Sequence, residues 1–83
     1  MKYSEVMQVL KTVEDAPGIT AKELVLREDL NPERLKYALG ILVCGNFIQK
    51  KYEYERRFNS KRTIRYYRTE KNAELLKKSL YQD

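Results

Sequence analysis

Two helix-start signals lie eleven residues apart, and they constrain the fold more than any other feature of the chain. Thr20 is followed at the capping-box spacing by Glu23, a pair that opens helices. Asn31 precedes Pro32 and Glu33, which join a capping side chain to a proline at the first helical position. Each signal is local, and together they predict two helices joined by a short turn.

The two helices are expected to form a helix–turn–helix unit between Ile19 and Ile48. The first covers residues 20–27 and the second residues 32–45, with a strand beginning soon after. The second helix has one apolar stripe, formed by Leu35, Ala38, Leu39 and Leu42. Two helices joined this closely leave one helix face free to enter a groove.

Three further elements surround this unit in a single domain of residues 1–83. A helix over residues 2–14 should stop before Pro17 and Gly18, which favour a turn. Ile19 can pair with a later strand. Residues 47–68 have the composition of a β-hairpin, and Thr69 is a plausible cap for a last helix over residues 70–81. The predicted fold is α+β and mainly helical: a three-helix core, a two-stranded hairpin and a C-terminal helix.

The alternation of side chains sets the expected hairpin register. Tyr54 should pair with Tyr66, which puts Phe58 opposite Arg62 and leaves a loop of residues 59–61. This register also sets Glu55 across from Arg65, a favourable ion pair. A two-residue loop would instead oppose two arginines, so we prefer the three-residue loop. Four tyrosines are then expected on inward faces: Tyr3, Tyr52, Tyr54 and Tyr66.

Positive charge is concentrated in the predicted hairpin. Residues 47–68 carry eight basic and two acidic side chains, whereas the other 61 residues have a net charge of −1. An ordinary solvated face mixes its signs, so this asymmetry indicates an anionic partner such as nucleic acid.

Composition argues against other classes of protein. The chain has no histidine and a single cysteine, Cys44, so it offers no disulfide and little for a zinc site. It also has no glycine-rich phosphate loop and no clustered carboxylates, so we expect neither an enzyme nor a cofactor. No apolar run is long enough to cross a bilayer, and we expect a soluble, cytoplasmic protein.

The order of elements resembles the winged helix-turn-helix domain of small transcription regulators of the MarR, ArsR and PadR kind. Residues 20–24 (TAKEL) repeat the pattern that opens the second helix of that family, and residues 31–42 (NPERLKYALGIL) follow its recognition helix without a gap. The family places a glycine after that helix, where this chain has Asn46. Asparagine is the best non-glycine residue for the left-handed cap expected there.

The resemblance implies duplex DNA binding, with the second predicted helix of the unit in the major groove and the hairpin as a basic wing on the backbone or in the minor groove. Candidates for reading bases are Asn31, Glu33, Arg34, Lys36 and Tyr37. Candidates for backbone contacts are Lys50, Lys51, Arg56, Arg57, Lys61, Arg62 and Arg65. A homodimer through the C-terminal helix, with Leu75 and Tyr81 in the contact, is also expected. No effector can be identified.

Some residues depart from the family pattern and keep other functions open. Glu28 stands where the family has a buried leucine, and Leu26 where it has a polar residue. The second half of the recognition helix is apolar or small (Gly40, Ile41, Val43, Cys44) and poorly suited to reading bases. A winged helix used for protein–protein interaction is therefore one alternative. Binding of RNA or single strands, which would use the same charge, is another.

Overall fold

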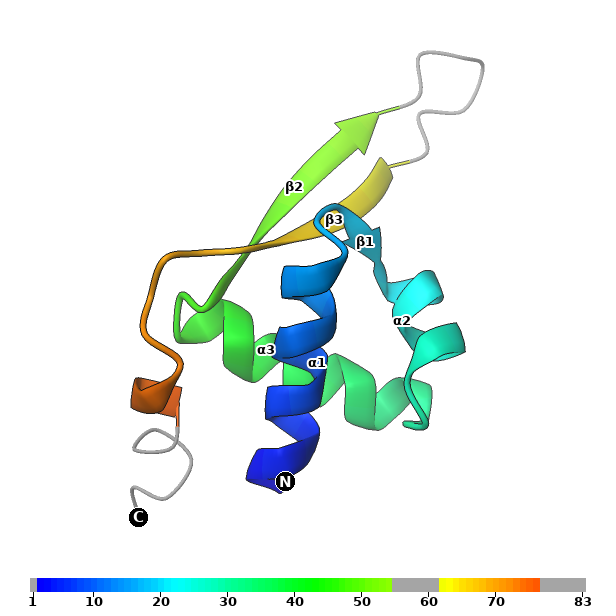
Figure 1. The fold of residues 1–83 in the computed structure, drawn as a ribbon. Helices are drawn as coiled ribbons and strands as arrows, with labels where there is room; N and C mark the ends of the chain where they lie inside the picture. The colour runs from blue at the N-terminus through cyan, green and yellow to red at the C-terminus, as the bar shows by residue number, and fades with distance from the viewer. Residues whose placement is uncertain (1, 55–61, 77–83) are drawn as a thin grey trace.

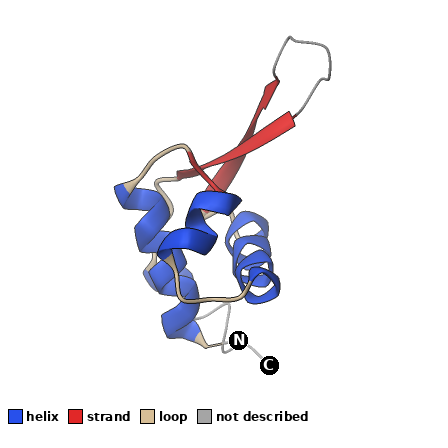
Figure 2. Cartoon of the chain, turned by 90° about the vertical axis from the view of Figure 1, so that its right-hand side faces the viewer, coloured by secondary structure: helices blue, strands red, loops and turns tan. Residues whose placement is uncertain are grey.

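The computed structural model describes residues 2–54 and 62–76, which form an α+β fold with a three-stranded antiparallel sheet (Figure 1). The helices cluster together, and two of the strands extend away from them as a projecting hairpin (Figures 1 and 2). The elements in order are α1 (Tyr3–Asp15), β1 (Ile19–Thr20), α2 (Ala21–Arg27), α3 (Pro32–Cys44), β2 (Ile48–Tyr54) and β3 (Arg62–Arg68).

The predicted caps position the helices α2 and α3. The Thr20 hydroxyl accepts a hydrogen bond from the Glu23 backbone N–H at 3.2 Å, and Asn31 Oδ1 accepts one from the Arg34 N–H at 2.8 Å. Each bond satisfies one of the backbone donors that the first turn of a helix leaves unpaired. Both N-cap predictions are confirmed.

The left-handed cap expected after α3 is also present. Asn46 has φ 63°, a left-handed conformation that asparagine tolerates better than most side chains. The Phe47 N–H donates to the Leu42 carbonyl at 2.9 Å, and the Asn46 N–H donates to the Val43 carbonyl at 3.0 Å. These two bonds form a Schellman motif with Asn46 at its left-handed position. The motif reverses the chain sharply and delivers Phe47 into the core.

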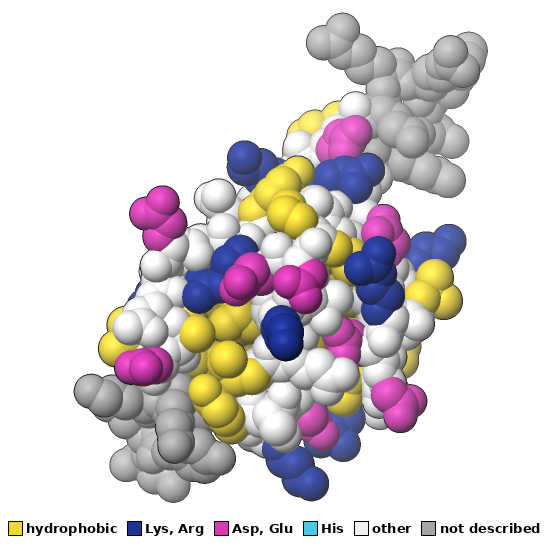
Figure 3. Space-filling view, viewed as in Figure 1, with side chains coloured by type: hydrophobic (Ala, Val, Ile, Leu, Met, Phe, Trp, Pro, Cys, Tyr) yellow, Lys and Arg dark blue, Asp and Glu magenta, His cyan; other side chains and the backbone are white. Residues whose placement is uncertain are grey.

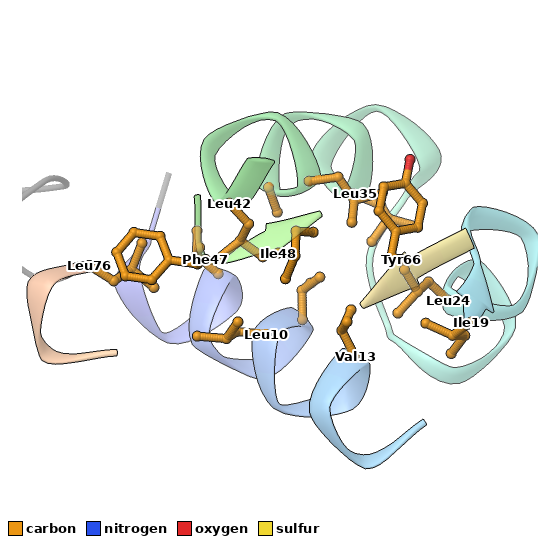
Figure 4. Close-up of a cluster of buried hydrophobic side chains, with 14 residues drawn as sticks. Leu10, Val13, Ile19, Leu24, Leu35, Leu42, Phe47, Ile48, Tyr66 and Leu76 are labelled. Carbon is orange, nitrogen blue, oxygen red and sulfur yellow. The ribbon is translucent and has the colours of Figure 1, made fainter. Parts of the chain in front are cut away.

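One hydrophobic core joins the helices to the base of the sheet (Figure 4). The stripe predicted on α3 is buried, and Leu10 and Val13 of α1 point toward it (Figure 4). Val9 of α1 is fully buried as well. Because the buried stripe of α3 packs on α1, the opposite face of α3 points away from α1.

The sheet has the order β1-β3-β2, so the hairpin shares β3 with the short strand β1. Ile19 pairs with Tyr66, which confirms that this residue can join a later strand. The predicted hairpin register is wrong. Tyr54 pairs with Arg62 rather than Tyr66, and Tyr66 pairs with Lys50. Residues 55–61 thus connect the strands. This segment, which includes Phe58, Glu55 and the predicted loop, lies outside the described residues.

The observed register differs from the predicted one by four residues, so it keeps the alternation and moves the side chains along the hairpin. Tyr66 and Ile48 reach the core at its base. Tyr52 and Tyr54 lie on the same side of the hairpin but farther out, and their exposed fractions are 45% and 62%. The prediction that these two rings face inward is therefore wrong, because the hairpin projects beyond the helices that would cover them (Figure 2).

The C-terminal helix begins later than predicted. Residues 70–73 are not helical, and the helical turn starts at Glu74, whose N–H is capped by Asn72 Oδ1 at 2.9 Å. The predicted cap, Thr69, instead donates its hydroxyl to the carbonyls of Asn46 (2.6 Å) and Phe47 (3.0 Å). It therefore ties the end of β3 to the end of α3. Leu76 is fully buried, and residues 77–81 of the predicted helix lie outside the described part of the chain.

The two residues that depart from the family pattern have opposite environments. Leu26 has an exposed fraction of 80%, whereas Glu28 is buried at 6%. The Glu28 carboxylate accepts a hydrogen bond from the Thr12 hydroxyl of α1, and its N–H donates to the Leu24 carbonyl at 2.8 Å. The helix α2 thus keeps its full length with a carboxylate turned inward.

No helix in residues 2–54 or 62–76 has the length and apolar character needed to cross a membrane.

Candidate nucleic-acid interface

The outward face of α3 is open to solvent. Glu33, Lys36, Tyr37 and Gly40 are exposed along it, and the ring of Tyr37 is 64% exposed. A methyl group added at Gly40 would meet nothing within 4 Å, so another surface can approach the helix closely there. A shallow hollow of about 490 Å³ covers this face and is lined by Glu33, Lys36, Tyr37, Gly40, Ile41 and Cys44.

Two of the five predicted base-reading residues already have partners. The oxygen of the Asn31 side chain caps α3. The guanidinium of Arg34 bonds both carboxylate oxygens of Glu5 on α1, at 2.8 and 2.9 Å. A base edge would have to compete with this ion pair for Arg34. The structure therefore separates the predicted set: Glu33, Lys36 and Tyr37 share the open face, and Asn31 and Arg34 serve the fold as well.

A larger groove of about 560 Å³ lies between α2, α3 and the hairpin. It is lined by Ala21, Val25, Pro32, Leu35, Lys36, Leu39, Gly40, Val43, Cys44, Lys50, Ile64 and Tyr66. Most of these side chains are apolar, and the basic members are Lys36 of α3 and Lys50 of β2. The groove thus joins the open face of α3 to one side of the hairpin.

The basic residues of the hairpin do not share one side. Side chains alternate along a strand, and directly paired residues lie on the same side. Lys50 and Arg62 therefore lie on the side that borders the groove, whereas Lys51 and Arg65 lie on the other. The remaining predicted wing residues, Arg56, Arg57 and Lys61, are outside the described residues.

Two arginines of the hairpin hold the fold together. Arg65 bonds the Glu53 carboxylate and donates to the Gly18 carbonyl at 2.9 Å. The bond and the charge of Glu53 raise the pKa of Arg65 above its ordinary value. The acidic partner of Arg65 among the described residues is thus Glu53, and the predicted partner, Glu55, lies outside them.

Arg68 has a structural role that the sequence did not reveal. Its Nη1 donates to the carbonyls of Phe47 (3.1 Å) and Thr69 (2.6 Å), and its Nη2 donates to that of Lys71 (2.7 Å). Its Nε lies 3.6 Å from the Glu14 carboxylate of α1. Arg68 therefore clamps the base of the hairpin to α1. Arg68 contributed to the charge asymmetry seen in the sequence. Its guanidinium is bound within the fold, however, and is not free to contact a phosphate.

The face on which α1 lies in front carries acidic and basic side chains side by side (Figure 3). A face with both signs of charge mixed in this way does not favour binding of a polyanion such as DNA. The candidate interface is therefore limited to the open face of α3 and the hairpin side with Lys50 and Arg62.

Sequence reasoning missed that two tyrosines, Tyr52 and Tyr54, are exposed on the same side of the hairpin as Lys50 and Arg62. The Arg62 guanidinium lies 4.8 Å from the centre of the Tyr52 ring, a cation–π contact on the groove side of the hairpin. Only the correct register could have placed these rings in solvent.

Cys44 is exposed at the end of α3, and the described residues contain no group of three or more potential metal ligands.

No protein-family model, curated protein or solved structure matches this chain. The function of the chain is therefore inferred from the geometry and charge of the described residues.

Proposed function

We propose that this chain is a winged helix-turn-helix protein that binds duplex DNA and regulates transcription, with α3 as the recognition helix and the β2–β3 hairpin as the wing. One observation carries the proposal: the open face of α3 and the hairpin side with Lys50 and Arg62 border the same groove. A helix and a basic projection on one side of a small domain suit simultaneous contact with a groove and the adjoining backbone.

The dimensions and chemistry of α3 support its role in this proposal. A helix with its side chains is about 10–12 Å across, close to the width of about 12 Å of the major groove. Lys36 can donate to guanine and Glu33 can accept from cytosine, while Gly40 leaves the helix backbone uncovered. Arg34 would join them only after leaving Glu5.

The hairpin supplies the affinity in this account. Lys50 and Arg62 would contact phosphates from the groove side, and Arg56, Arg57 and Lys61 belong to the segment that connects the two strands. If about four phosphates are neutralised, the logarithm of the affinity should fall against the logarithm of salt concentration with a slope of roughly −3 to −4.

Fluorescence anisotropy with a labelled duplex of about 20 base pairs, between roughly 50 and 200 mM salt, tests this proposal. The double variant Lys50→Ala/Arg62→Ala should bind more weakly and reduce the magnitude of the slope by about 2. Lys11→Ala, which removes an exposed lysine of α1, is the matched control and should leave the slope unchanged. A wild-type slope near zero, or the same slope in the double variant, would contradict the proposal.

A protein-interaction module is the second candidate, and the apolar lining of the groove favours it. Val25, Val43 and Ile64 belong to that lining, and a protein partner could cover them with an apolar segment. The exposed Leu26 lies on α2, which also borders the groove. If purified protein binds no duplex, single strand or RNA at low salt, this second function becomes the better one.

Dimerisation through the C-terminal helix is part of the proposal, since regulators of the family that the chain resembles usually dimerise through terminal helices. Leu75 is exposed on the described part of that helix, and Tyr81 lies outside the described residues. Sedimentation equilibrium should show a weak dimer, and a monomer at high micromolar concentration would contradict it.

A further inference from the structure

Two tyrosine rings stand in solvent on the hairpin without the helices that cover its base. Tyr52 and Tyr54 follow Ile48 and Lys50 on the same side of β2, where Ile48 is buried and the three residues beyond it are exposed. Aromatic residues favour strands, so strand propensity alone could explain tyrosine at these positions. Strand propensity does not account for the basic side chains of Arg62 and Lys50 on the same side of the hairpin.

The spacing of these two positions along the strand suits a planar ligand. Residues two apart on one side of a strand are separated by about 6.8 Å, which is twice the strand rise. Successive bases of a nucleic acid strand are stacked about 3.4 Å apart. The backbone positions that carry Tyr52 and Tyr54 therefore have the spacing of every second base of a stacked strand, or of two rings on either side of a single inserted base.

The charges beside the rings suit the backbone of the same ligand. Arg62, the direct pairing partner of Tyr54, holds its planar guanidinium 4.8 Å from the centre of the Tyr52 ring. Lys50 lies two residues inward on the same side, next to the groove. Cations among stacking rings are the combination found in sites for single-stranded nucleic acid, where rings hold bases and cations hold phosphates.

We propose that Tyr52, Tyr54 and Arg62, the stacking patch, bind unpaired bases, so that the chain holds a single DNA strand on the groove side of the hairpin. The inference rests on the proposed binding of DNA and adds a second form of DNA to the same interface. Duplex bases are already stacked on one another and offer no free face to a tyrosine, so the patch distinguishes unpaired from paired DNA.

Anisotropy with a labelled oligothymidylate and with a blunt duplex of matched length tests the inference. Tyr52→Thr/Tyr54→Thr removes both rings and retains residues that favour strands. This variant should lose about 5- to 150-fold in affinity for the single strand for each ring that stacks on a base. Its affinity for the duplex should change less than about twofold, and the salt slope for the single strand should stay the same, because no charge is altered.

Two further variants separate stacking from folding. Tyr52→Phe/Tyr54→Phe keeps the rings and should bind the single strand as the wild type does. Gln49→Thr, at an exposed position on the other side of β2, should bind both ligands normally. Circular dichroism of each variant checks that the hairpin is retained.

The outcomes separate this inference from the proposed function. Wild-type affinity for the single strand in the threonine variant, or an equal loss for both ligands, would overturn the inference while duplex binding stands. Tyrosine-dependent binding of the single strand without duplex binding would support the inference and overturn the proposed function. Binding of neither ligand would overturn both.

Discussion

Replacing Glu28 with leucine tests how the buried carboxylate affects stability. One carboxylate oxygen accepts from the Thr12 hydroxyl, while Oε2 is buried with no hydrogen-bond partner among the described residues. A buried acceptor left unpaired costs about 1–3 kcal/mol, and leucine removes that cost. Thr12 loses one bond, worth about 1 kcal/mol, but its hydroxyl also lies 3.0 Å from the Gln8 carbonyl and keeps that acceptor.

The free energy of unfolding of Glu28→Leu should therefore rise by about 1–2 kcal/mol, because burying leucine adds to the relief of the unpaired oxygen. Urea denaturation followed by circular dichroism measures it, and Tm should rise by about 4–8 °C per kcal/mol. Glu28→Gln is the control: it keeps an acceptor for Thr12 but buries an unpaired amide, so it should not stabilise the fold. A leucine variant less stable than the wild type would refute this reasoning.

Three other substitutions test separate parts of the structure. Gly40→Ala should raise the free energy of unfolding by about 0.5–1 kcal/mol in urea denaturation, because the added methyl meets nothing and alanine favours helix. Asn46→Ala should lower Tm through strain at φ 63°, whereas Asn46→Gly should not, and equal effects would argue against the left-handed cap. Glu5→Gln releases Arg34 from its ion pair and should strengthen duplex binding several-fold by anisotropy, and weaker binding would show that the pair positions α3.

The sequence predicted the helix–turn–helix region well because its signals are local. Thr20 and Asn31 cap helices through bonds to residues three positions later, and Asn46 takes the left-handed conformation in a motif closed within six residues. Such contacts are encoded by neighbouring residues. They do not depend on how distant parts of the chain meet.

The hairpin register failed for the opposite reason. Every register that preserves alternation puts the same side chains on the same side, so the pattern could not choose between pairings four residues apart. The choice depends on where β3 meets β1 and the core, and the pairing of Tyr66 with Ile19 and Lys50 determines it. The candidate site changed with the register, since Tyr52 and Tyr54 moved from the expected core into solvent.

Contacts between distant residues explain the other differences. Thr69 looked like a helix cap from its neighbours, but its hydroxyl bonds carbonyls more than twenty residues earlier in the chain. Arg34 looked free to read a base until α1 placed Glu5 beside it. Composition showed that the excess positive charge lies in residues 47–68. It could not show that Arg65 and Arg68 of that segment are bonded within the fold.

Selection of bound sites from random duplex DNA tests the central claim most directly, namely that the open face of α3 reads bases. The wild type should enrich a short motif, and Lys36→Ala should lose its preference at one position of that motif while the others remain. Lys11→Ala on α1 should enrich the wild-type motif. No enrichment by the wild type, or an unchanged motif in Lys36→Ala, would contradict the assignment of this face as the reader of DNA sequence.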